Sequence, residues 1–498
     1  MKRVYFVLSI LVALSMLLSA CGAPAPAATE APAAPAATEA PAVAATEAPA
    51  AATEAPAAPA ELEGTLKVWS FTNDTYVIAT AFKELHPKVN IEFTMIPMNG
   101  GEFQTKVRAA AGTADAPDVV ALEAAFVREW VEADGLLADQ SDLLPLSKEL
   151  KSYQAGVDVG TFGGMTKAYT FESTPGAFFY RRSIAKECLG TDDPAQVQAM
   201  VSDMTKFVEI AEKIKNCGTK DYYMVGTAGE LSSPFFTTRD QPWVVDGKLV
   251  IDPKVVEYVH FAKMMRDNAY ESGAGQWSEG WFAGMNDTLK DANGKLKKVF
   301  SYFLPTWGLP YVLINNAKAK DGSSDTSGDW AMVKGPMSYQ WGGTWIGALE
   351  GSKQAALAKE FVKFSCLDEA FLTKLAQGYY TNAKLKEIDP TVPDSLVFNP
   401  GDFVSSQLVV EKIIPSFDGS SAAKFLGGQN PYGAFAEMAP GVSGRLIQGT
   451  DDAIQRALGD PLGAYLGGTM TEAEMWAAFL TAVGNENPDL VLPEAPVK

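Results

Sequence analysis

The first 63 residues restrict how the chain can fold, because neither of their two parts can contribute to a globular core. Two basic residues precede an apolar stretch, residues 4–18, which is too short to span a bilayer and is typical of a secretory signal. We therefore expect residues 1–20 to be a signal peptide. Any folded structure must then come from residues 64–498.

The apolar stretch ends in the string Leu18-Ser19-Ala20-Cys21, which resembles a bacterial lipobox. In a lipobox, small residues admit the signal peptidase and the cysteine thiolate takes a diacylglyceryl group before cleavage. We expect Cys21 to be lipidated and to anchor the mature chain to the cell membrane, outside the cytoplasm, because two acyl chains hold a protein far more stably than one. A cysteine that follows the signal by chance is the alternative.

Residues 21–63 are composed mainly of Ala, Pro, Thr and Glu, and the unit Ala-Thr-Glu-Ala-Pro begins at residues 28, 37, 45 and 52. Such a segment has too little apolar bulk to offset the entropy of ordering, so we predict a disordered tether. If it is extended at about 3.1 Å per residue, it reaches on the order of 100 Å from the membrane.

The remaining residues are too many for one simple core and suit two lobes. Hydrophobic content of 47% and charged content of 20% are ordinary for a soluble globular chain. Loss of Lys2 and Arg3 with the signal peptide takes the formal charge from −19 to −21. A net negative charge of this size argues against nucleic acid and anionic lipid as partners.

Three cysteines remain after Cys21, and the sequence leaves their pairing open. Outside the cytosol, Cys188 and Cys217 are candidates for a disulfide that closes a loop around a helical segment. Cys366 falls in a helical pattern over residues 355–377, so we expect it to be a buried small hydrophobe.

Histidine is scarce, which limits the chemistry that the chain can perform. His86 and His260 are the only two, so a three-histidine metal site or a Ser-His-Asp triad has almost no basis. No zinc-binding spacing is present. We expect no metal and no cofactor.

The N-terminal part of the folded region alternates strands with helices. The residue patterns predict a strand at 65–71, a helix at 75–85, a strand at 89–96, a helix at 103–111 and a strand at 118–122. This alternation indicates a mainly parallel sheet covered on both faces. Ligands of such sheets gather at the carboxyl ends of the strands, here the loops at residues 70–74 and at Glu123.

Four segments, taken in order, resemble one family. They are FKELHPKVNIEF (82–93), KVRAAAGTADAPDVVALEA (106–124), GAFFYRRSIAKECLG (176–190) and WGGTWIGALEGSKQAALAKEFVKFSCLDE (341–369). The chain resembles the extracellular solute-binding proteins of ATP-driven importers, the group that includes maltose-binding proteins. This resemblance implies an α/β, two-lobed periplasmic-binding-protein-like fold of type II, with discontinuous lobes joined by hinge crossovers.

Three segments depart from the family pattern. Ser202-Asp203-Met204 stands where many relatives carry Thr-Trp, Arg181-Arg182 replaces a more usual Asn-Lys, and residues 287–298 look like an insertion. These differences concern the identity of the ligand and leave the implied architecture unchanged.

The resemblance also implies where the chain passes between lobes. Lobe one would comprise residues 64–171 and 344–384, and lobe two residues 172–343 and 385–498, with crossings near 168–173, 342–347 and 381–384. Gly343 and its neighbour Gly342 suit both hinge torsion and close approach of a ligand to the backbone. A plain turn is the alternative for these glycines.

Sugar recognition uses flat apolar faces and planar polar groups, and the chain has 10 Trp to supply the former. Candidates near predicted strand ends or loops are Trp277, Trp307, Trp341 and Trp345; Trp243, beside Arg239 and Asp240, ranks lower. Packing in the core is the alternative for any of these rings.

Polar candidates follow the predicted strands. They are Asn73 and Asp74 after the first strand, Glu123 after the strand from Asp118, and Glu172 at the first crossing. A charged acceptor makes the stronger bond to a hydroxyl. Asp74 is also a candidate helix N-cap, and Glu123 a solvated charge ahead of a helix.

From this resemblance we expect the chain to be a monomeric, non-enzymatic, lipid-anchored substrate-binding component of an ABC importer. It would capture a sugar or oligosaccharide between its lobes and deliver it to a membrane permease. A polyamine, peptide or other cationic solute is an alternative ligand, because aromatic boxes also bind cations. A surface glycoside hydrolase or lyase with paired carboxylates is the alternative from another class.

Overall fold

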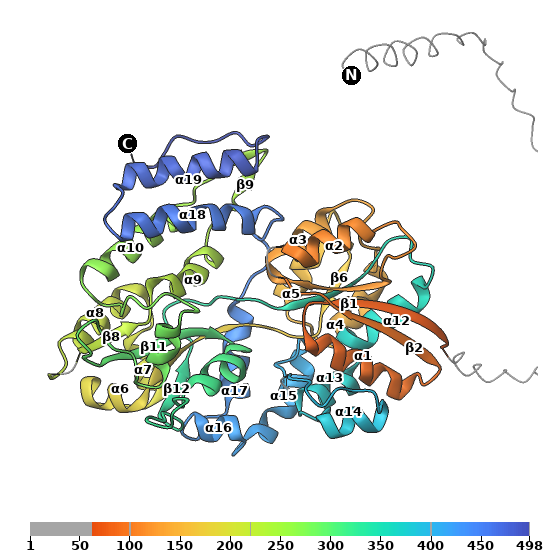
Figure 1. Cartoon of the computed structure of the whole chain (residues 1–498), viewed down its shortest axis with the longest axis horizontal. Helices are drawn as coiled ribbons and strands as arrows, with labels where there is room; N and C mark the ends of the chain where they lie inside the picture. Colours follow the sequence, from red (N-terminus) through yellow and green to blue (C-terminus); the bar gives the residue numbers. More distant parts are fainter. Residues whose placement is uncertain (1–61, 99–100, 220, 399–400, 498) are drawn as a thin grey trace, which may run out of the picture. The chain divides into compact units, whose positions relative to one another are not determined.

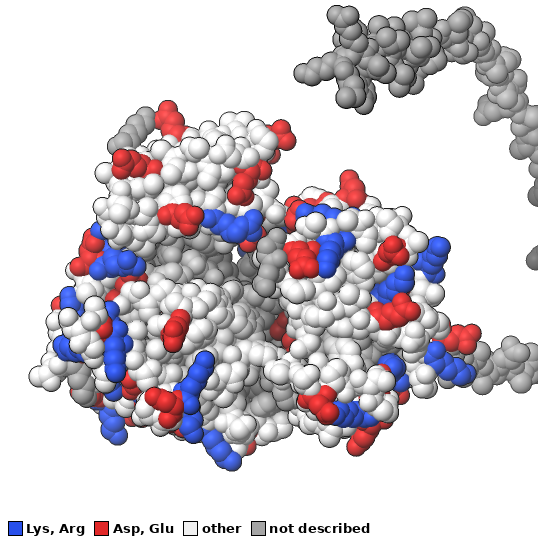
Figure 2. Space-filling view, viewed as in Figure 1, with Lys and Arg blue, Asp and Glu red and all other residues white. Residues whose placement is uncertain are grey.

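The computed structural model describes residues 62–98, 101–219, 221–398 and 401–497. The predicted signal peptide, the lipidation of Cys21 and nearly all of the predicted tether lie outside these residues. Within the described part of the chain, every helix falls short of the length and hydrophobicity that crossing a membrane requires. Figure 2 shows acidic and basic side chains interspersed over the visible face.

One sheet has five strands in the order β2-β1-β3-β13-β6. These strands are β1 Gly64–Ser70, β2 Val89–Met95, β3 Val119–Glu123, β6 Ala168–Thr170 and β13 Thr344–Ala348. β1, β2 and β3 are parallel, whereas β13 is antiparallel to both β3 and β6. The predicted β-α-β unit and parallel pairing are confirmed.

Helices cover both faces of this sheet, on the right of Figure 1. They include α1 Asn73–Leu85, α2 Glu102–Ala110, α3 Ala124–Glu132, α12 Ala355–Leu367 and α13 Glu369–Ala376, with the shorter α4 Leu144–Glu149 and α5 Gln154–Val159. Along β3, Val119 and Ala121 join the core beneath α1 and α12. Val120 and Leu122 join the opposite core with α2 and α3. Successive side chains of a strand point to opposite faces of its sheet. Because both faces are covered here, consecutive residues of β3 are buried.

Capping residues fix where the helices around this sheet begin and end. The side chain of Thr72 accepts the Asp74 backbone N–H at the start of α1, and the helix ends at His86, just before Pro87. The single helix predicted for residues 355–377 is two helices. Asp368 ends α12, and its side chain accepts the Phe371 N–H to begin α13.

The other large sheet has four strands in the order β12-β7-β11-β8, on the left of Figure 1. They are β7 Gly176–Arg181, β8 Asp221–Val225, β11 Lys297–Pro305 and β12 Trp330–Val333. The helices around it are α6 Arg182–Leu189, α7 Pro194–Met200, α8 Met204–Lys215, α9 Ser232–Thr237, α10 Pro253–Asp267, α11 Glu279–Met285, α16 Ser421–Phe425, α17 Pro431–Met438, α18 Asp451–Leu466 and α19 Glu472–Glu486. Two small hairpins, β4 Thr161–Phe162 with β5 Met165–Thr166 and β9 Val244–Val245 with β10 Lys248–Leu249, complete the strands. We call the part around the five-stranded sheet lobe one and the part around the four-stranded sheet lobe two.

The chain passes between the lobes in extended segments that pair with one another. Ser173 donates its backbone N–H to Phe403 (2.8 Å), and Ser405 donates its N–H to Phe171 (2.9 Å). Helix α14, Asn382–Ile388, packs on α1, while α15, Gln407–Ile413, follows this pairing. The lobe boundaries stay predictions, and the position of α14 favours a third crossing after residue 384.

A disulfide joins Cys188 at the end of α6 to Cys217 just after α8, over a sequence separation of 29 residues. The candidate pairing is therefore confirmed. Cys366 is free and fully buried, as expected, and burial raises the pKa of its thiol to about 12. A thiol of this kind is a poor nucleophile.

Replacing both disulfide cysteines by alanine should lower the free energy of unfolding by about 2 to 3 kcal/mol, because the unfolded chain regains the entropy of a closed loop. Guanidinium denaturation followed by tryptophan fluorescence measures the change. Reductant should destabilise the natural protein by a similar amount and leave the double variant unaffected. A double variant as stable as the parent would contradict the prediction.

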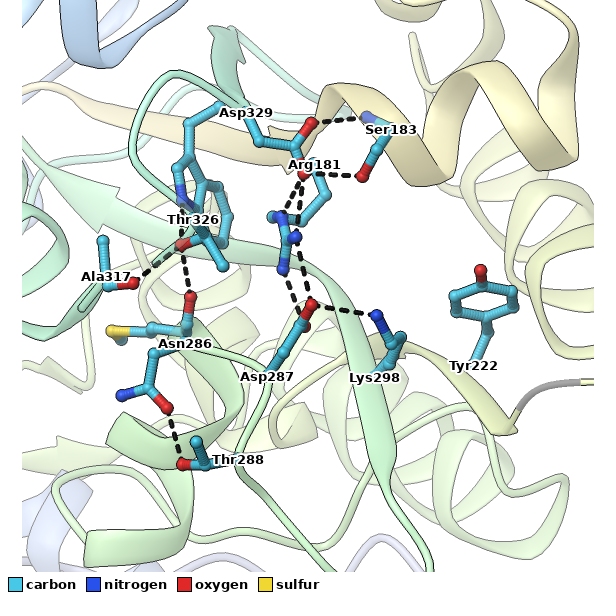
Figure 3. A network of polar contacts seen from close by, with 12 residues as sticks. Arg181, Ser183, Tyr222, Asn286, Asp287, Thr288, Lys298, Ala317, Thr326 and Asp329 are labelled. Atoms are coloured by element: carbon cyan, nitrogen blue, oxygen red, sulfur yellow. Dashed lines mark hydrogen bonds and ion pairs between the residues drawn. The ribbon is translucent and has the colours of Figure 1, made fainter. Parts of the chain in front are cut away.

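Arg181, one of the departures from the family pattern, lies buried at the end of β7 (Figure 3). Its guanidinium donates to Asp287 at 2.8 Å and to Asp329 at 2.8 Å. The Asp287 carboxylate also accepts a hydrogen bond from the Lys298 ammonium at 3.0 Å. The Asp329 carboxylate accepts one from the backbone N–H of Ser183 at 2.7 Å. Arg181, Asp287 of the predicted insertion and Lys298 of β11 therefore form one structural network within lobe two.

Candidate functional site

The polar residues predicted from strand ends meet at one edge of the five-stranded sheet. β1 and β3 are parallel, and β6 runs in the same direction because β13 is antiparallel to both β3 and β6. The ends of β1, β3 and β6 and the start of β13 therefore share an edge. Asp74, Glu123, Glu172 and Gly343 lie at these four positions.

A cavity of about 380 Å³ opens at this edge, and we call it the edge cavity. Its lining residues are Phe71, Thr72, Asn73, Asp74, Glu123, Glu172, Trp307, Tyr311, Gly342, Gly343, Thr344, Val397 and Asp402. Six of the predicted site residues are among them: Asn73, Asp74, Glu123, Glu172, Trp307 and Gly343.

Lobe two supplies the opposite wall of the edge cavity. Trp307 follows the end of β11, and Tyr311 lies one turn further on, in the π-helical segment Leu309–Ile314. The Tyr311 hydroxyl donates to the Asp74 carboxylate at 3.0 Å. A solute in this cavity would thus be in reach of side chains from both lobes.

Three of the predicted tryptophans form an aromatic cluster beside the cavity. The Trp277 ring lies parallel to the Trp307 ring at 6.2 Å, and the Trp341 ring packs edgewise on Trp307 at 5.1 Å. Trp277 is 50% exposed and has a positive φ of 68°. Such strain in a bulky residue is uncommon and often accompanies function.

The carboxyl groups of Glu123 and Glu172 have perturbed acidity. Burial raises the pKa of Glu123 to about 7, although backbone N–H groups of Ala125 and Ala124 partly offset the effect. Burial raises the pKa of Glu172 to about 8, and the nearby Asp74 and Glu123 carboxylates add to the shift. Groups whose charge is this sensitive to their surroundings are common at binding sites.

Two further hollows help to define the site. One, of about 340 Å³, shares Glu123 and Gly342 with the edge cavity and contains the buried pair of Arg239 and Asp451, joined at 2.9 Å. A wider groove of about 1210 Å³ lies between α8, α10 and the C-terminal residues 493–496, and it contains no predicted site residue. The edge cavity is therefore the candidate site, and the smaller hollow extends it.

Two of the predicted tryptophans are core residues, which corrects the sequence-based prediction. Trp243 is 0% exposed and packs against Phe236 and Phe479, with Arg239 stacked over its ring. Trp345 is 1% exposed, and its indole N–H donates to the Gly156 carbonyl at 2.9 Å. All five positions of β13 are buried, so a side chain there faces one core or the other.

Tyr311 and Asp402 are among the lining residues that the sequence did not identify as candidates. Tyr311 stands four positions after Trp307, so a search of the whole turn after the strand would have found it. Asp402 comes from a segment distant in sequence that reaches the site only because the next residue, Phe403, pairs with Ser173. Nothing near Asp402 in the sequence signals that contact.

A family model for bacterial extracellular solute-binding proteins matches residues 78–391, more than half of the chain. The chain belongs to this family of extracellular solute-binding proteins. No curated protein matches this solute-binding protein by sequence. The fold that the family implies is the two-lobed α/β architecture described above.

Solved structures with this fold include several binding proteins. An extracellular solute-binding protein of family 1 has a TM-score of 0.64 and 16% identity, with 85% of this chain and 99% of that chain covered. An ABC transporter associated binding protein from B. animalis subsp. lactis, in complex with beta-1,6-galactobiose, has a TM-score of 0.59 and 19% identity, with 87% and 100% covered. The galacto-N-biose/lacto-N-biose I-binding protein from Bifidobacterium longum, in complex with lacto-N-biose, has a TM-score of 0.60 and 14% identity, with 86% and 99% covered.

Proposed function

We propose that this solute-binding protein captures a carbohydrate between its two lobes and delivers it to the membrane permease of an ABC importer. The observation that carries the proposal is the edge cavity, where the ring of Trp307 from lobe two faces carboxylates of lobe one. A flat aromatic ring suits the C–H face of a sugar, and carboxylates suit its hydroxyls. Two of the neighbours named above were solved with disaccharides bound.

The site residues proposed for this role are those of the edge cavity and the aromatic cluster. They comprise Asn73, Asp74, Glu123, Glu172, Trp277, Trp307, Tyr311, Trp341, Gly343 and Asp402. We propose further that the protein acts as a monomer and is anchored outside the cytoplasm through lipid on Cys21.

Ligand capture would act by a shift in the populations of open and closed states. A ligand favours the closed state only by the amount that it binds that state more tightly. Trp307 and Tyr311 approach the ligand from lobe two, and Asp74 and Glu123 approach it from lobe one, so contact with both sets favours closure.

A thermal-shift screen of the purified protein against mono- and oligosaccharides tests the proposal. A sugar at a hundredfold excess over its Kd should raise Tm by about 3 °C, because it stabilises the native state alone. Chromatography of the incubated sugar should show no product. A shift with polyamines or peptides alone would reject carbohydrate as the ligand, and slow turnover would favour the hydrolase.

A further inference from the structure

The edge cavity has an unbalanced set of charged groups. Its lining includes four carboxyl groups, from Asp74, Glu123, Glu172 and Asp402, which we call the carboxylate cluster. None of the described residues that line the cavity is Lys or Arg. The arginine that lines the adjoining hollow, Arg239, pairs with Asp451 through one guanidinium nitrogen.

The side-chain donors of the lining already donate within the protein. Thr72 and Tyr311 donate to Asp74, Asn73 donates to the Val397 carbonyl, Trp307 donates to the Trp341 carbonyl, and Thr344 hydrogen-bonds Glu172. When its glutamates are ionised, the cavity therefore offers its ligand many acceptors and few side-chain donors.

A ligand that matches such a site has donors in excess. A hydroxyl brings a donor together with acceptor lone pairs, whereas an ammonium brings three donors and no acceptor. Hydrogen bonds between an ammonium and a carboxylate are also about twice as strong as neutral ones. The balance of hydrogen-bonding groups therefore favours a protonated amine over a further hydroxyl.

Two helix N-termini at the same edge oppose this preference. α1 and α3 each place about half a positive charge there. Glu123 accepts the Ala125 N–H at the start of α3, and Asp74 lies in the first turn of α1, so each helix end already faces a carboxyl group. Glu172, which lies at neither helix end, adds a carboxyl group beyond these two.

We propose that the edge cavity binds a carbohydrate that carries a protonated amine, with the ammonium among the carboxylate cluster and a sugar face against Trp307. The proposal deepens the proposed function and rests on it. It names the chemical class of the ligand as an amino sugar or an oligosaccharide that contains one.

The raised pKa values in the carboxylate cluster allow a second test of the proposal. In the free protein the pKa values of Glu123 and Glu172 are raised to about 7 and about 8, so both carboxyl groups are largely protonated at pH 5. An ammonium beside them lowers both pKa values, and the complex then holds fewer protons than the free protein. Affinity should therefore rise from pH 5 to pH 6.5, where an aliphatic amine stays protonated.

The other polar groups of the cavity lining do not oppose this pH dependence. Asp74 from α1 and Asp402 are acidic, Tyr311 and Thr344 are neutral hydroxyls, and neither His86 nor His260 lines the cavity. Titration by these neighbours does not reverse the expected slope, because ionisation of an acidic neighbour also favours a cation.

Titration calorimetry on matched sugars tests the proposal. The probes are glucosamine and galactosamine with their β-1,4-linked dimers and trimers, each compared with its N-acetylated and its hydroxyl counterpart. The amine form should bind at least about tenfold more tightly, the equivalent of about 1.4 kcal/mol. Proton release, read from the dependence of the heat on buffer ionisation at pH 6.5, should accompany only the amine form.

Two isosteric variants locate the ammonium. Glu123→Gln and Glu172→Gln keep an acceptor oxygen for the Ala125 N–H and for Thr344, so the fold is preserved. Each should weaken binding of the amine form several-fold more than binding of the hydroxyl form. Glu411→Gln removes one charge at an exposed position outside the cavity and should change the affinity for neither form of the sugar.

The outcomes separate this proposal from the one on which it rests. Equal or tighter binding of the hydroxyl or N-acetyl form overturns the amine assignment and leaves carbohydrate capture in place. Binding of spermidine without binding of any sugar overturns both. An amine preference that survives in both glutamine variants also overturns the assignment, because it places the ammonium elsewhere.

Discussion

Trp307→Ala should weaken sugar binding by about 30-fold to 1000-fold, the equivalent of about 2 to 4 kcal/mol. The ring lines the edge cavity and is only partly buried there, so it is available to a ligand. It also contacts both other members of the aromatic cluster, and its N–H donates to the Trp341 carbonyl at 3.0 Å. Truncation therefore removes the ligand-facing surface and loosens its support.

Titration calorimetry with the sugar found in the screen measures this loss. Trp307→Phe keeps an aromatic face but lacks the indole N–H, so its affinity should fall between those of the parent and the alanine variant. Phe162→Ala is a matched control, because Phe162 is exposed, aromatic and absent from the cavity lining. If the folded Trp307→Ala variant bound the sugar with full affinity, Trp307 would not be part of the binding site.

Strand and helix patterns predicted the sheet edge correctly because they depend on local periodicity. Once β1 and β3 are parallel neighbours, Asp74 and Glu123 must emerge at the same edge, whatever packs around them. Their role in ligand binding stays a prediction.

The direction of a side chain and contacts between distant segments were beyond such reasoning. Trp341 and Trp345 bracket Gly342 and Gly343, but Trp345 lies inside a strand buried on both faces, whereas Trp341 precedes that strand. Asp402 reaches the cavity through pairing of its neighbour with the first crossing, a contact over more than 200 residues in sequence. Only the assembled fold decides positions of this kind.

Arg181→Met should lower the free energy of unfolding by about 3 to 4 kcal/mol, because it leaves two partly buried carboxylates without their shared cation. Arg181 has 6% of its side chain exposed, against 14% for Asp287 and 24% for Asp329. Lys298 still reaches Asp287 in the variant, and Asp329 keeps the Ser183 N–H, so the loss stays near the lower end of this range.

The effect should depend on pH in a direction that the network fixes. Burial alone would raise the pKa of Asp287, but hydrogen bonds and charge from Arg181 and Lys298 hold it below its ordinary value of about 3.9. A carboxyl group with a lowered pKa stabilises the fold above its unfolded-state pKa, and this contribution is lost as the pH falls through the folded-state value. In the variant the Asp287 carboxyl group protonates more readily, so the gap between parent and variant should narrow from pH 7 towards pH 4.

Urea denaturation of both proteins at pH 7, 5 and 4 measures this gap. Arg445→Met removes an exposed arginine and should stay within about 0.5 kcal/mol of the parent at each pH. Adding Asp287→Asn and Asp329→Asn to Arg181→Met should recover part of the loss at pH 7, because the unpaired charges are gone. A gap that is the same at every pH, with no recovery in the triple variant, would mean that Arg181 acts through packing on Trp330 and not through its charge.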